Sequence, residues 1–369
     1  MGGIRKGYTE RMQRFQKAVE EIMEQKDIRM LSQKLAGKKV IIWGAGNCGH
    51  HVYEALCEQK ATVSFFGDNA LAGKTDAQTG LLVIGMDEAA TDRENTYVLL
   101  SVVEREPYQK IYGQLLEAGF QDDQIVCMSS YIERLPVSFF SNNVENYRKV
   151  YETLADDFSR EVYIERMKRV YLLNDMTAIV SPPEELYFDA RNVLTGEEVF
   201  VDCGGYVGDT ALQFIEKCGG KYRKILIFEP ESCNKKAIED NLQGEKYELF
   251  PYGVWSEDTV LSFDARGTEG SCIVKEETGN RIQVVSLDHC VYAQKPTFIK
   301  MDIEGAELEA LKGSERIIEE YKPKLAICLY HKPEDLFEIP LFVKQLREDY
   351  DLYIRQYRAD RYETVLYAV

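Results

Sequence analysis

The feature that most constrains the fold is a glycine-rich loop between an apolar strand and a helix, and it occurs twice. The segment FVDCGGYVGDT spans Phe200–Thr210, and the segment IIWGAGNCGHH spans Ile41–His51. Glycine permits positive φ angles and lets a ligand approach the backbone closely. A strand, a glycine loop and a helix in this order form the ligand-binding end of a Rossmann-type unit. The sequence therefore predicts two such units.

The rest of the 369-residue chain can be divided around these loops. Helical spacing of apolar residues predicts an amphipathic helix or helix pair over residues 1–36. Strands and helices alternate over residues 37–130, which predicts a small Rossmann-like domain with a mostly parallel sheet. Helical spacing returns over residues 131–196 and predicts a linker or a lid. Alternation resumes over residues 197–369 and ends in an antiparallel hairpin, so the predicted fold class is α/β with two Rossmann-like domains.

Charge and composition narrow the classes of partner. The formal net charge is −17, a field that repels phosphate backbones and acidic lipid surfaces, so we expect neither nucleic-acid nor membrane partners. No apolar run approaches membrane-spanning length, and the N-terminal segment lacks the apolar core of a secretory signal, which predicts a cytoplasmic protein. Nine scattered cysteines without a CxxC pair predict neither disulfides nor a zinc site. The expected partner is a small molecule, and the oligomeric state stays open.

Carboxylates around the second glycine loop indicate its ligand. Asp202 and Asp209 flank the glycines, and Glu229 ends the next strand, where a carboxylate can accept hydrogen bonds from both ribose hydroxyls. These carboxylates would repel the pyrophosphate of a dinucleotide. S-adenosylmethionine has no phosphate and carries a sulfonium and an ammonium group, so it is the predicted cofactor. The candidate cofactor-binding residues are Asp202, Gly204, Gly205, Gly208, Asp209, Thr210, Glu229 and Ser256.

A longer set of segments carries a family resemblance. FVDCGGYVGDT, IFEPE, VVSLD and above all IKMDIEGAELEALKG, at residues 299–313, together resemble the FkbM family of S-adenosylmethionine-dependent methyltransferases. The resemblance covers approximately residues 197–369. It implies a class I methyltransferase sheet that ends in an antiparallel hairpin. It also implies O-methylation, commonly of hydroxyls on sugars or small biosynthetic products.

Polar residues after two later strands are the candidate catalytic groups. Asp302 and Glu304 follow the strand FIKMD, and His331 follows the strand LAICLY. A hydroxyl acceptor must lose its proton as its new bond forms, and a histidine with an ordinary pKa accepts protons near neutral pH. Two structural alternatives are an N-cap role for Asp302 and an exposed loop position for His331. The three residues could instead hold a divalent ion, but their spacing matches no recognised metal motif, so we predict no metal.

The first glycine loop predicts a different ligand. Gly44, Gly46 and Gly49 match G-x-G-x-x-G between a strand and a helix, and Asp68 closes the next strand. This loop holds no carboxylate, so a phosphate at the helix N-terminus is tolerated. The first half of the chain resembles small Rossmann-like modules that accompany sugar-modifying enzymes, which implies a nucleotide or nucleotide-sugar ligand. A purely architectural unit is the alternative.

Together these patterns predict an S-adenosylmethionine-dependent O-methyltransferase that acts on a hydroxyl of a small, sugar-linked acceptor. One alternative is an NAD-dependent sugar oxidoreductase or epimerase that uses the first loop. Another is a non-catalytic nucleotide-binding protein on a methyltransferase scaffold.

Overall fold

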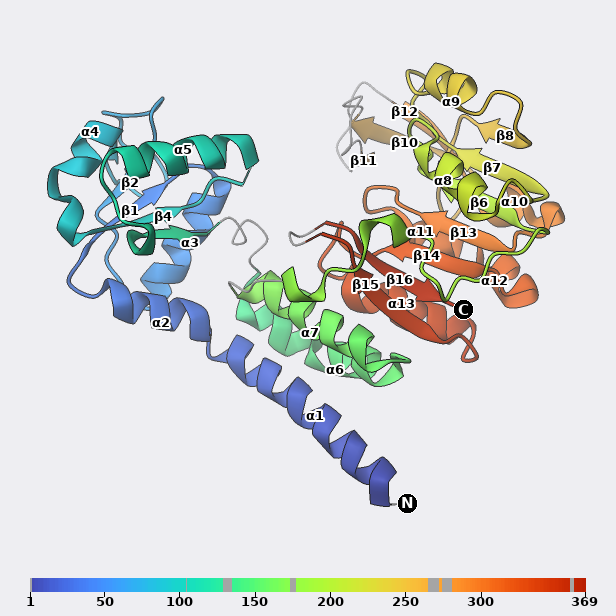
Figure 1. Ribbon diagram of the computed structural model, residues 1–369, viewed down its shortest axis with the longest axis horizontal. Helices are drawn as coiled ribbons and strands as arrows, with labels where there is room; N and C mark the ends of the chain where they lie inside the picture. The colour runs from blue at the N-terminus through green and yellow to red at the C-terminus, as the bar shows by residue number, and fades with distance from the viewer. Residues whose placement is uncertain are drawn as a thin grey trace. The chain divides into compact units, whose positions relative to one another are not determined.

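The computed structural model describes residues 2–103, 105–128, 135–172, 177–264, 272–273, 281–358 and 362–369. It divides into two compact units. The first comprises Met1–Val144 with Ile164–Met176, and the second comprises Glu145–Tyr163 with Thr177–Val369. Each unit has its own main sheet, parallel in the first unit and mostly parallel in the second, which confirms the predicted α/β fold class (Figure 1).

The sheet of the first unit has five parallel strands in the order β3-β2-β1-β4-β5. The strands are β1 (Lys39–Trp43), β2 (Phe65–Gly67), β3 (Val83–Ile84), β4 (Thr96–Leu100) and β5 (Ile125–Cys127). Its helices are α3 (Asn47–Glu58), α4 (Met86–Ala89) and α5 (Arg105–Glu117). Val40 and Ile42 join one buried cluster, whereas Ile41 and Trp43 join another. Both faces of β1 are therefore covered, as expected in a parallel sheet.

Four further helices come before the first strands of the two main sheets. They are α1 (Gly2–Met23), α2 (Lys26–Leu35), α6 (Val137–Thr153) and α7 (Asp157–Tyr171). The boundary between the two units passes through α6 and α7. Tyr147, Tyr151 and Tyr163 are buried and belong to the second unit, and the role of this segment as a linker or a lid stays a prediction. None of the described helices has both the length and the apolar composition needed to cross a bilayer.

The sheet of the second unit has seven strands in the order β15-β16-β14-β13-β6-β7-β8. The strands are β6 (Val199–Cys203), β7 (Lys224–Phe228), β8 (Tyr247–Phe250), β13 (Phe298–Met301), β14 (Lys324–Cys328), β15 (Leu352–Gln356) and β16 (Thr364–Ala368). Only β16 runs antiparallel to its neighbours in this sheet, and it lies between β14 and β15 with all five of its residues buried. The predicted methyltransferase sheet with a terminal antiparallel hairpin is thereby confirmed.

Helices and a smaller sheet complete the second unit. The helices are α8 (Asp209–Lys217), α9 (Lys235–Asn241), α10 (Leu287–Cys290), α11 (Glu307–Lys312), α12 (Glu315–Tyr321) and α13 (Asp335–Leu346). The small sheet has the order β11-β10-β12-β9, formed by β9 (Gly253–Val254), β10 (Thr259–Asp264), β11 (Cys272–Ile273) and β12 (Arg281–Val285).

The apolar spacing of AELEALKGSERIIEEY, residues 306–321, is typical of one helix, but the structure divides this segment into two. The helix is interrupted at Gly313 and Ser314, which separate α11 from α12. A Cβ atom on Gly313 would lie 2.1 Å from the carbonyl oxygen of Trp255, so the backbones pack directly against each other there. This close contact between distant segments ends α11.

Candidate active site

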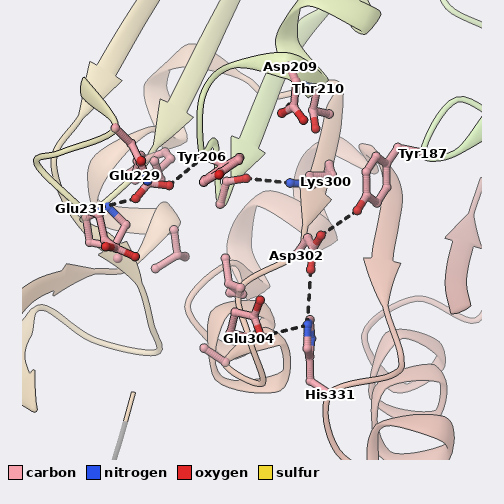
Figure 2. A pocket seen from close by; sticks show the side chains of 18 of the residues that line it. Tyr187, Tyr206, Asp209, Thr210, Glu229, Glu231, Lys300, Asp302, Glu304 and His331 are labelled. Atoms are coloured by element: carbon pink, nitrogen blue, oxygen red, sulfur yellow. Dashed lines mark hydrogen bonds and ion pairs between the residues drawn. The ribbon is translucent and has the colours of Figure 1, made fainter. Parts of the chain in front are cut away.

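A cavity of about 760 Å³ lies at the carboxyl edge of the seven-stranded sheet and is lined largely by the loops after β6, β7, β13 and β14. Its volume falls within the range of small-molecule sites, roughly 300–1,000 Å³. Figure 2 shows acidic side chains from several of these loops around it. The predicted residues that line it are Gly204, Asp209, Thr210, Glu229, Asp302, Glu304 and His331.

Four predicted cofactor-binding residues do not line this cavity. They are Asp202, Gly205, Gly208 and Ser256. Gly205 packs against Ile227, because a Cβ atom there would lie 2.3 Å from the Ile227 side chain. Gly208 is the N-cap of α8, and Ser256 hydrogen-bonds Glu309 at the side of α11. These positions shape the loop or its surroundings.

Gly204 joins the glycine loop to two neighbouring strands. Its φ angle is +82°, and a Cβ atom on it would lie 2.0 Å from the carbonyl oxygen of Asp302. Its backbone N–H donates to the carbonyl oxygen of Phe228 at 3.0 Å. A side chain at this position would therefore separate the loop after β6 from the loop after β13.

A buried ion pair stabilises the glycine loop. Lys300 Nζ lies 3.1 Å from Asp202 Oδ1 and donates a hydrogen bond of 2.8 Å to the carbonyl oxygen of Gly204. Both side chains are buried, and Lys300 Nζ also lies 5.1 Å from the centre of the Tyr187 ring. Burial opposes the charge of Lys300, but Asp202 and Asp302 together raise the pKa of Lys300. Lys300 is therefore a cation that fixes Gly204.

Glu229 follows β7 and its carboxylate points toward the glycine loop (Figure 2). It accepts hydrogen bonds from the backbone N–H groups of Tyr206 at 2.8 Å and Glu231 at 2.9 Å. Burial raises the pKa of Glu229 against the effect of these hydrogen bonds. A carboxylate has about four lone-pair sites, so two backbone donors leave acceptor capacity for ligand hydroxyls.

The carboxylate of Asp302 lies between two tyrosine hydroxyls, and the sequence analysis identified neither tyrosine. Its carboxylate accepts hydrogen bonds from the hydroxyls of Tyr187 at 2.7 Å and Tyr330 at 3.0 Å. Burial alone would raise its pKa, but Lys300 and His331 hold the pKa of Asp302 below its usual range. The N-cap alternative is wrong, because α11 begins at Glu307 and Asp302 lies in the loop before it.

His331 lies between carboxylates, and its side chain is only 8% exposed. Nδ1 is 2.9 Å from Glu307 Oε1, while Nε2 is 3.4 Å from Asp302 Oδ1 and 3.5 Å from Glu304 Oε2. Burial by itself would lower the pKa of His331, but Glu307, Asp302 and Glu304 raise it to about 9. The exposed-loop alternative and the expected near-neutral pKa are therefore both wrong. In the free protein at neutral pH, this imidazole is mostly protonated.

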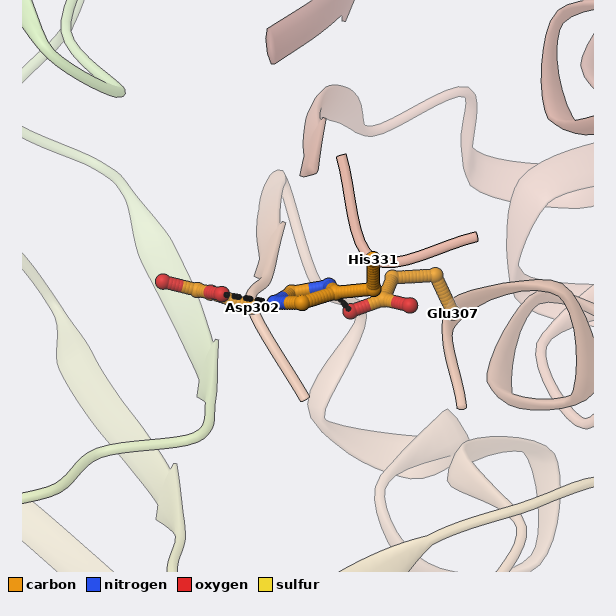
Figure 3. A group of neighbouring side chains, drawn as sticks. All are labelled: Asp302, Glu307 and His331. Carbon is orange, nitrogen blue, oxygen red and sulfur yellow. Dashed lines mark ion pairs between the residues drawn. The ribbon is translucent and has the colours of Figure 1, made fainter. Parts of the chain in front are cut away.

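Three of these groups have the chemistry of metal ligands. Among the described residues, Asp302, Glu307 and His331 offer ligand atoms that all lie within 4.8 Å of one another. Figure 3 shows that the two carboxylates contact opposite nitrogens of the imidazole ring. The prediction of no metal stays a prediction.

The structure also places the residues of the first glycine loop. The N–H of Gly44 donates to the carbonyl oxygen of Gly67 at 2.8 Å, which brings the loop beside Asp68. Oδ1 of Asp68 accepts hydrogen bonds from the N–H groups of Ala70 at 2.8 Å and Leu71 at 3.1 Å. The carboxylate therefore caps its own turn.

Two glycines of this loop differ in their surroundings. A Cβ atom on Gly49 would lie 2.0 Å from the carbonyl oxygen of Gly44, whereas one on Gly46 would meet nothing within 4 Å. Ser101 Oγ lies 2.9 Å from the carbonyl oxygen of Trp43 and 3.1 Å from that of Gly44. Packing explains Gly49, and Gly46 borders open space.

Comparison with known proteins addresses the family and the fold. Residues 202–357 match the family model described as methyltransferase FkbM domain. The structure of methyltransferase FkbM from Methylobacillus flagellatus KT is similar to this chain, with 22% identity, a TM-score of 0.67, and coverage of 97% of this chain and 99% of that one. No curated protein matches the chain.

Two further solved structures overlap with about half of the chain. Fibrillarin from Aeropyrum pernix, solved with natively bound S-adenosyl-L-methionine, has 10% identity, a TM-score of 0.32, and coverage of 48% of this chain and 69% of that one. Precorrin-6y C5,15-methyltransferase from Geobacter metallireducens GS-15 has 12% identity, a TM-score of 0.32, and coverage of 50% and 86%. The family match to residues 202–357 covers the glycine loop and the loops that carry Asp302 and His331. Those residues are therefore similar to a methyltransferase FkbM domain.

Proposed function

We propose that this chain transfers a methyl group from S-adenosylmethionine to a hydroxyl of a small, sugar-linked acceptor. The observation that carries the proposal is the acid-lined cavity beside Gly204, with Glu229 and Asp209 in its wall. A cationic donor without phosphate suits such a wall, because carboxylates stabilise positive charge and repel phosphate.

The residues around the cavity fit this donor. Glu229 retains acceptor capacity and follows the strand next to the glycine loop, which is where the ribose hydroxyls of an adenosine ligand are bound in Rossmann-type units. Asp209 and Thr210 begin α8 and line the same cavity. Asp202 acts indirectly in this scheme, because its ion pair with Lys300 supports the loop.

The same cavity offers groups for handling the acceptor proton. S-adenosylmethionine supplies an electrophilic methyl group, and the sulfur keeps the electron pair of the broken carbon–sulfur bond when the acceptor oxygen binds that carbon. The acceptor hydroxyl proton passes to Nε2 of neutral His331. Asp302 and Glu304 lie at the same nitrogen and stabilise the resulting imidazolium. Much of the acceleration comes from holding both reactants in line.

The first unit has a separate role in the proposal. Its loop carries no carboxylate, and Gly46 borders open space at the N-terminus of α3, where a phosphate is stabilised by the helix. We assign it a nucleotide or nucleotide-sugar ligand.

The test of the proposed function is methyl transfer from donor carrying an isotopic label in its methyl group. The purified chain is incubated with a panel of nucleotide-sugars and free sugars, and products are analysed by mass spectrometry. A gain of one labelled methyl group on an acceptor oxygen is the expected result. Transfer to nitrogen or carbon would refute O-methylation, and failure of the protein to bind the donor in calorimetry would refute the donor assignment.

A further inference from the structure

Glu307 contacts His331 from the side away from the cavity. In the structure Glu307 is fully buried and is the first residue of α11. Its Oε1 accepts a hydrogen bond from the N–H of Ile303 at 2.8 Å and lies 2.9 Å from Nδ1 of His331. Glu307 therefore connects the loop after β13 to the loop after β14.

The two ring nitrogens of His331 have different surroundings. Nε2 faces Asp302 and Glu304, which both line the cavity, while Nδ1 faces Glu307, which does not. A carboxylate at one ring nitrogen holds a proton there and leaves the other nitrogen with the lone pair when the ring is neutral. The position of Glu307 thus selects which nitrogen can accept a proton from the cavity.

We propose that Glu307 is a positioning residue that keeps a proton on Nδ1 of His331, so that Nε2 is the nitrogen that exchanges protons with the cavity. The catalytic use of this arrangement rests on the proposed function. The arrangement itself does not, because the tautomer of His331 is measurable without turnover.

Other charged and titratable groups also surround His331 and must be considered. Asp302 and Glu304 face Nε2, and the Tyr330 ring lies 4.2 Å from the imidazole ring between centroids. Lys332 and Asp335 follow in the chain, and the backbone N–H of Lys332 donates to Asp335 at 2.9 Å. Each of these side chains is retained in a Glu307→Gln variant, which removes the charge at Nδ1 and with it one cause of the raised pKa of Asp335.

The experiment is a pH titration of the full chain labelled with ¹⁵N-histidine, followed by long-range ¹H–¹⁵N NMR. The chain has four histidines, and His331→Asn assigns the relevant signal. We expect neutral His331 in the unaltered protein to carry its proton on Nδ1. Glu307→Gln should lower the pKa of His331 from about 9 toward neutrality, since loss of a neighbouring opposite charge commonly shifts a pKa by about 1–3.

Three results would overturn the proposal. The first is a neutral tautomer with its proton on Nε2 in the unaltered protein, which needs no variant and is therefore independent of folding. The second is an unchanged pKa and tautomer in Glu307→Gln. The third is selective broadening of the His331 signal by micromolar Mn²⁺, which would make the group a metal site.

A kinetic readout separates this proposal from the proposed function. With an active acceptor, the acidic limb of the kcat/KM profile should move to lower pH in Glu307→Gln, while affinity for S-adenosylmethionine is unchanged. Glu304→Gln is the matched control, because it removes a charge at Nε2 and leaves the Nδ1 tautomer intact. If no acceptor is methylated but the tautomer is as expected, the proposed function fails and the positioning role stands.

Discussion

The two glycine loops share a backbone plan and differ in the side chains that hold them. In each, the N–H of the first glycine donates to the carbonyl oxygen of the residue before an acidic side chain, Gly67 before Asp68 and Phe228 before Glu229. In each, a side chain from a neighbouring strand or its end contacts the carbonyl oxygen of that glycine. In the first unit this group is the Ser101 hydroxyl, and in the second it is the ammonium of Lys300.

The acidic residue beside each loop makes different contacts in the two units. Oδ1 of Asp68 accepts hydrogen bonds from the turn that follows it. The carboxylate of Glu229 instead accepts hydrogen bonds from two loops and lines a cavity. The second loop is held by a buried charge pair and surrounded by carboxylates, and the first is held by a neutral hydroxyl. This difference is consistent with the proposal of a cationic ligand in the second unit and an anionic ligand in the first.

The largest expected effect tests the groups that hold the loops. Lys300→Met leaves Asp202 buried without its partner, so we expect the second unit to lose about 3–5 kcal/mol of stability. Ser101→Ala removes a neutral hydroxyl and should destabilise the first unit by about 1 kcal/mol. Trp43 lies in the first unit and Trp255 in the second, so ¹⁹F NMR of 5-fluorotryptophan protein follows each unit separately during denaturation. Equal losses of stability in the two units would contradict the inference that a charge pair holds one loop and a neutral hydroxyl holds the other.

The next effect concerns the two acidic residues. Glu229→Ala should weaken S-adenosylmethionine binding about 10- to 100-fold, since hydrogen bonds to a charged group contribute about 1.5–3 kcal/mol. Asp68→Ala should leave that affinity unchanged. Isothermal titration calorimetry measures both, and Glu229→Gln controls for loss of the backbone contacts. Equal affinity of Glu229→Ala and the unaltered protein would refute the placement of the ribose.

The two units should also respond oppositely to pH. Burial and the charge of Glu307 raise the pKa of Asp335 in the second unit from 3.8 to about 7. Its contribution to stability is therefore full below pH 4 and is lost as the pH rises through 7. In the first unit, burial opposes ionisation, but Thr79 and His50 lower the pKa of Asp76, so its contribution is lost as the pH falls.

We expect the second unit to lose about 2–3 kcal/mol of stability between pH 5 and pH 8 through Asp335, since stability falls by about 1.4 kcal/mol for each pH unit up to the folded-state pKa. Asp335→Asn should remove this loss. The two fluorotryptophan signals, followed in denaturant at both pH values, provide the measurement. An unchanged pH dependence in Asp335→Asn would show that another group is responsible.

The smallest structural effect is expected at Gly46. Gly46→Asp points into open space, so stability should change by no more than about 0.5 kcal/mol. The new carboxylate should nevertheless weaken binding of uridine diphosphate, the probe for calorimetry, because it gives the first loop the acidic character of the second. If uridine diphosphate binds equally well to this variant, the phosphate does not lie at this loop.

Local patterns predicted the elements that carry both sites. Apolar runs located the strands, and the rule that parallel strands end at one edge placed Asp302, Glu304 and His331 around one cavity. The glycines were harder to interpret. Gly205 and Gly49 are explained by packing within the protein, which spacing along the chain cannot distinguish from contact with a ligand.

Contacts between residues far apart in the chain could not be predicted from the sequence. Tyr187 reaches Asp302 across 115 residues, and no nearby motif identified it. Tyr330 was next to a predicted residue, but its hydroxyl could not be directed to Asp302 from sequence alone. The pKa of His331 depends on three carboxylates from two segments, so a histidine identified by its ordinary pKa became a cation in the folded protein.

The interior position of β16 has a consequence for synthesis on the ribosome. β14 and β15 precede β16 in the chain, yet the pairing of either strand with β16 cannot form until residues 364–368 have emerged. Until then β14 presents an unpaired edge, which is a template for aggregation. Because the loop with His331 begins at the end of β14, the pocket matures last, and a nascent chain stalled before residue 364 should need a chaperone.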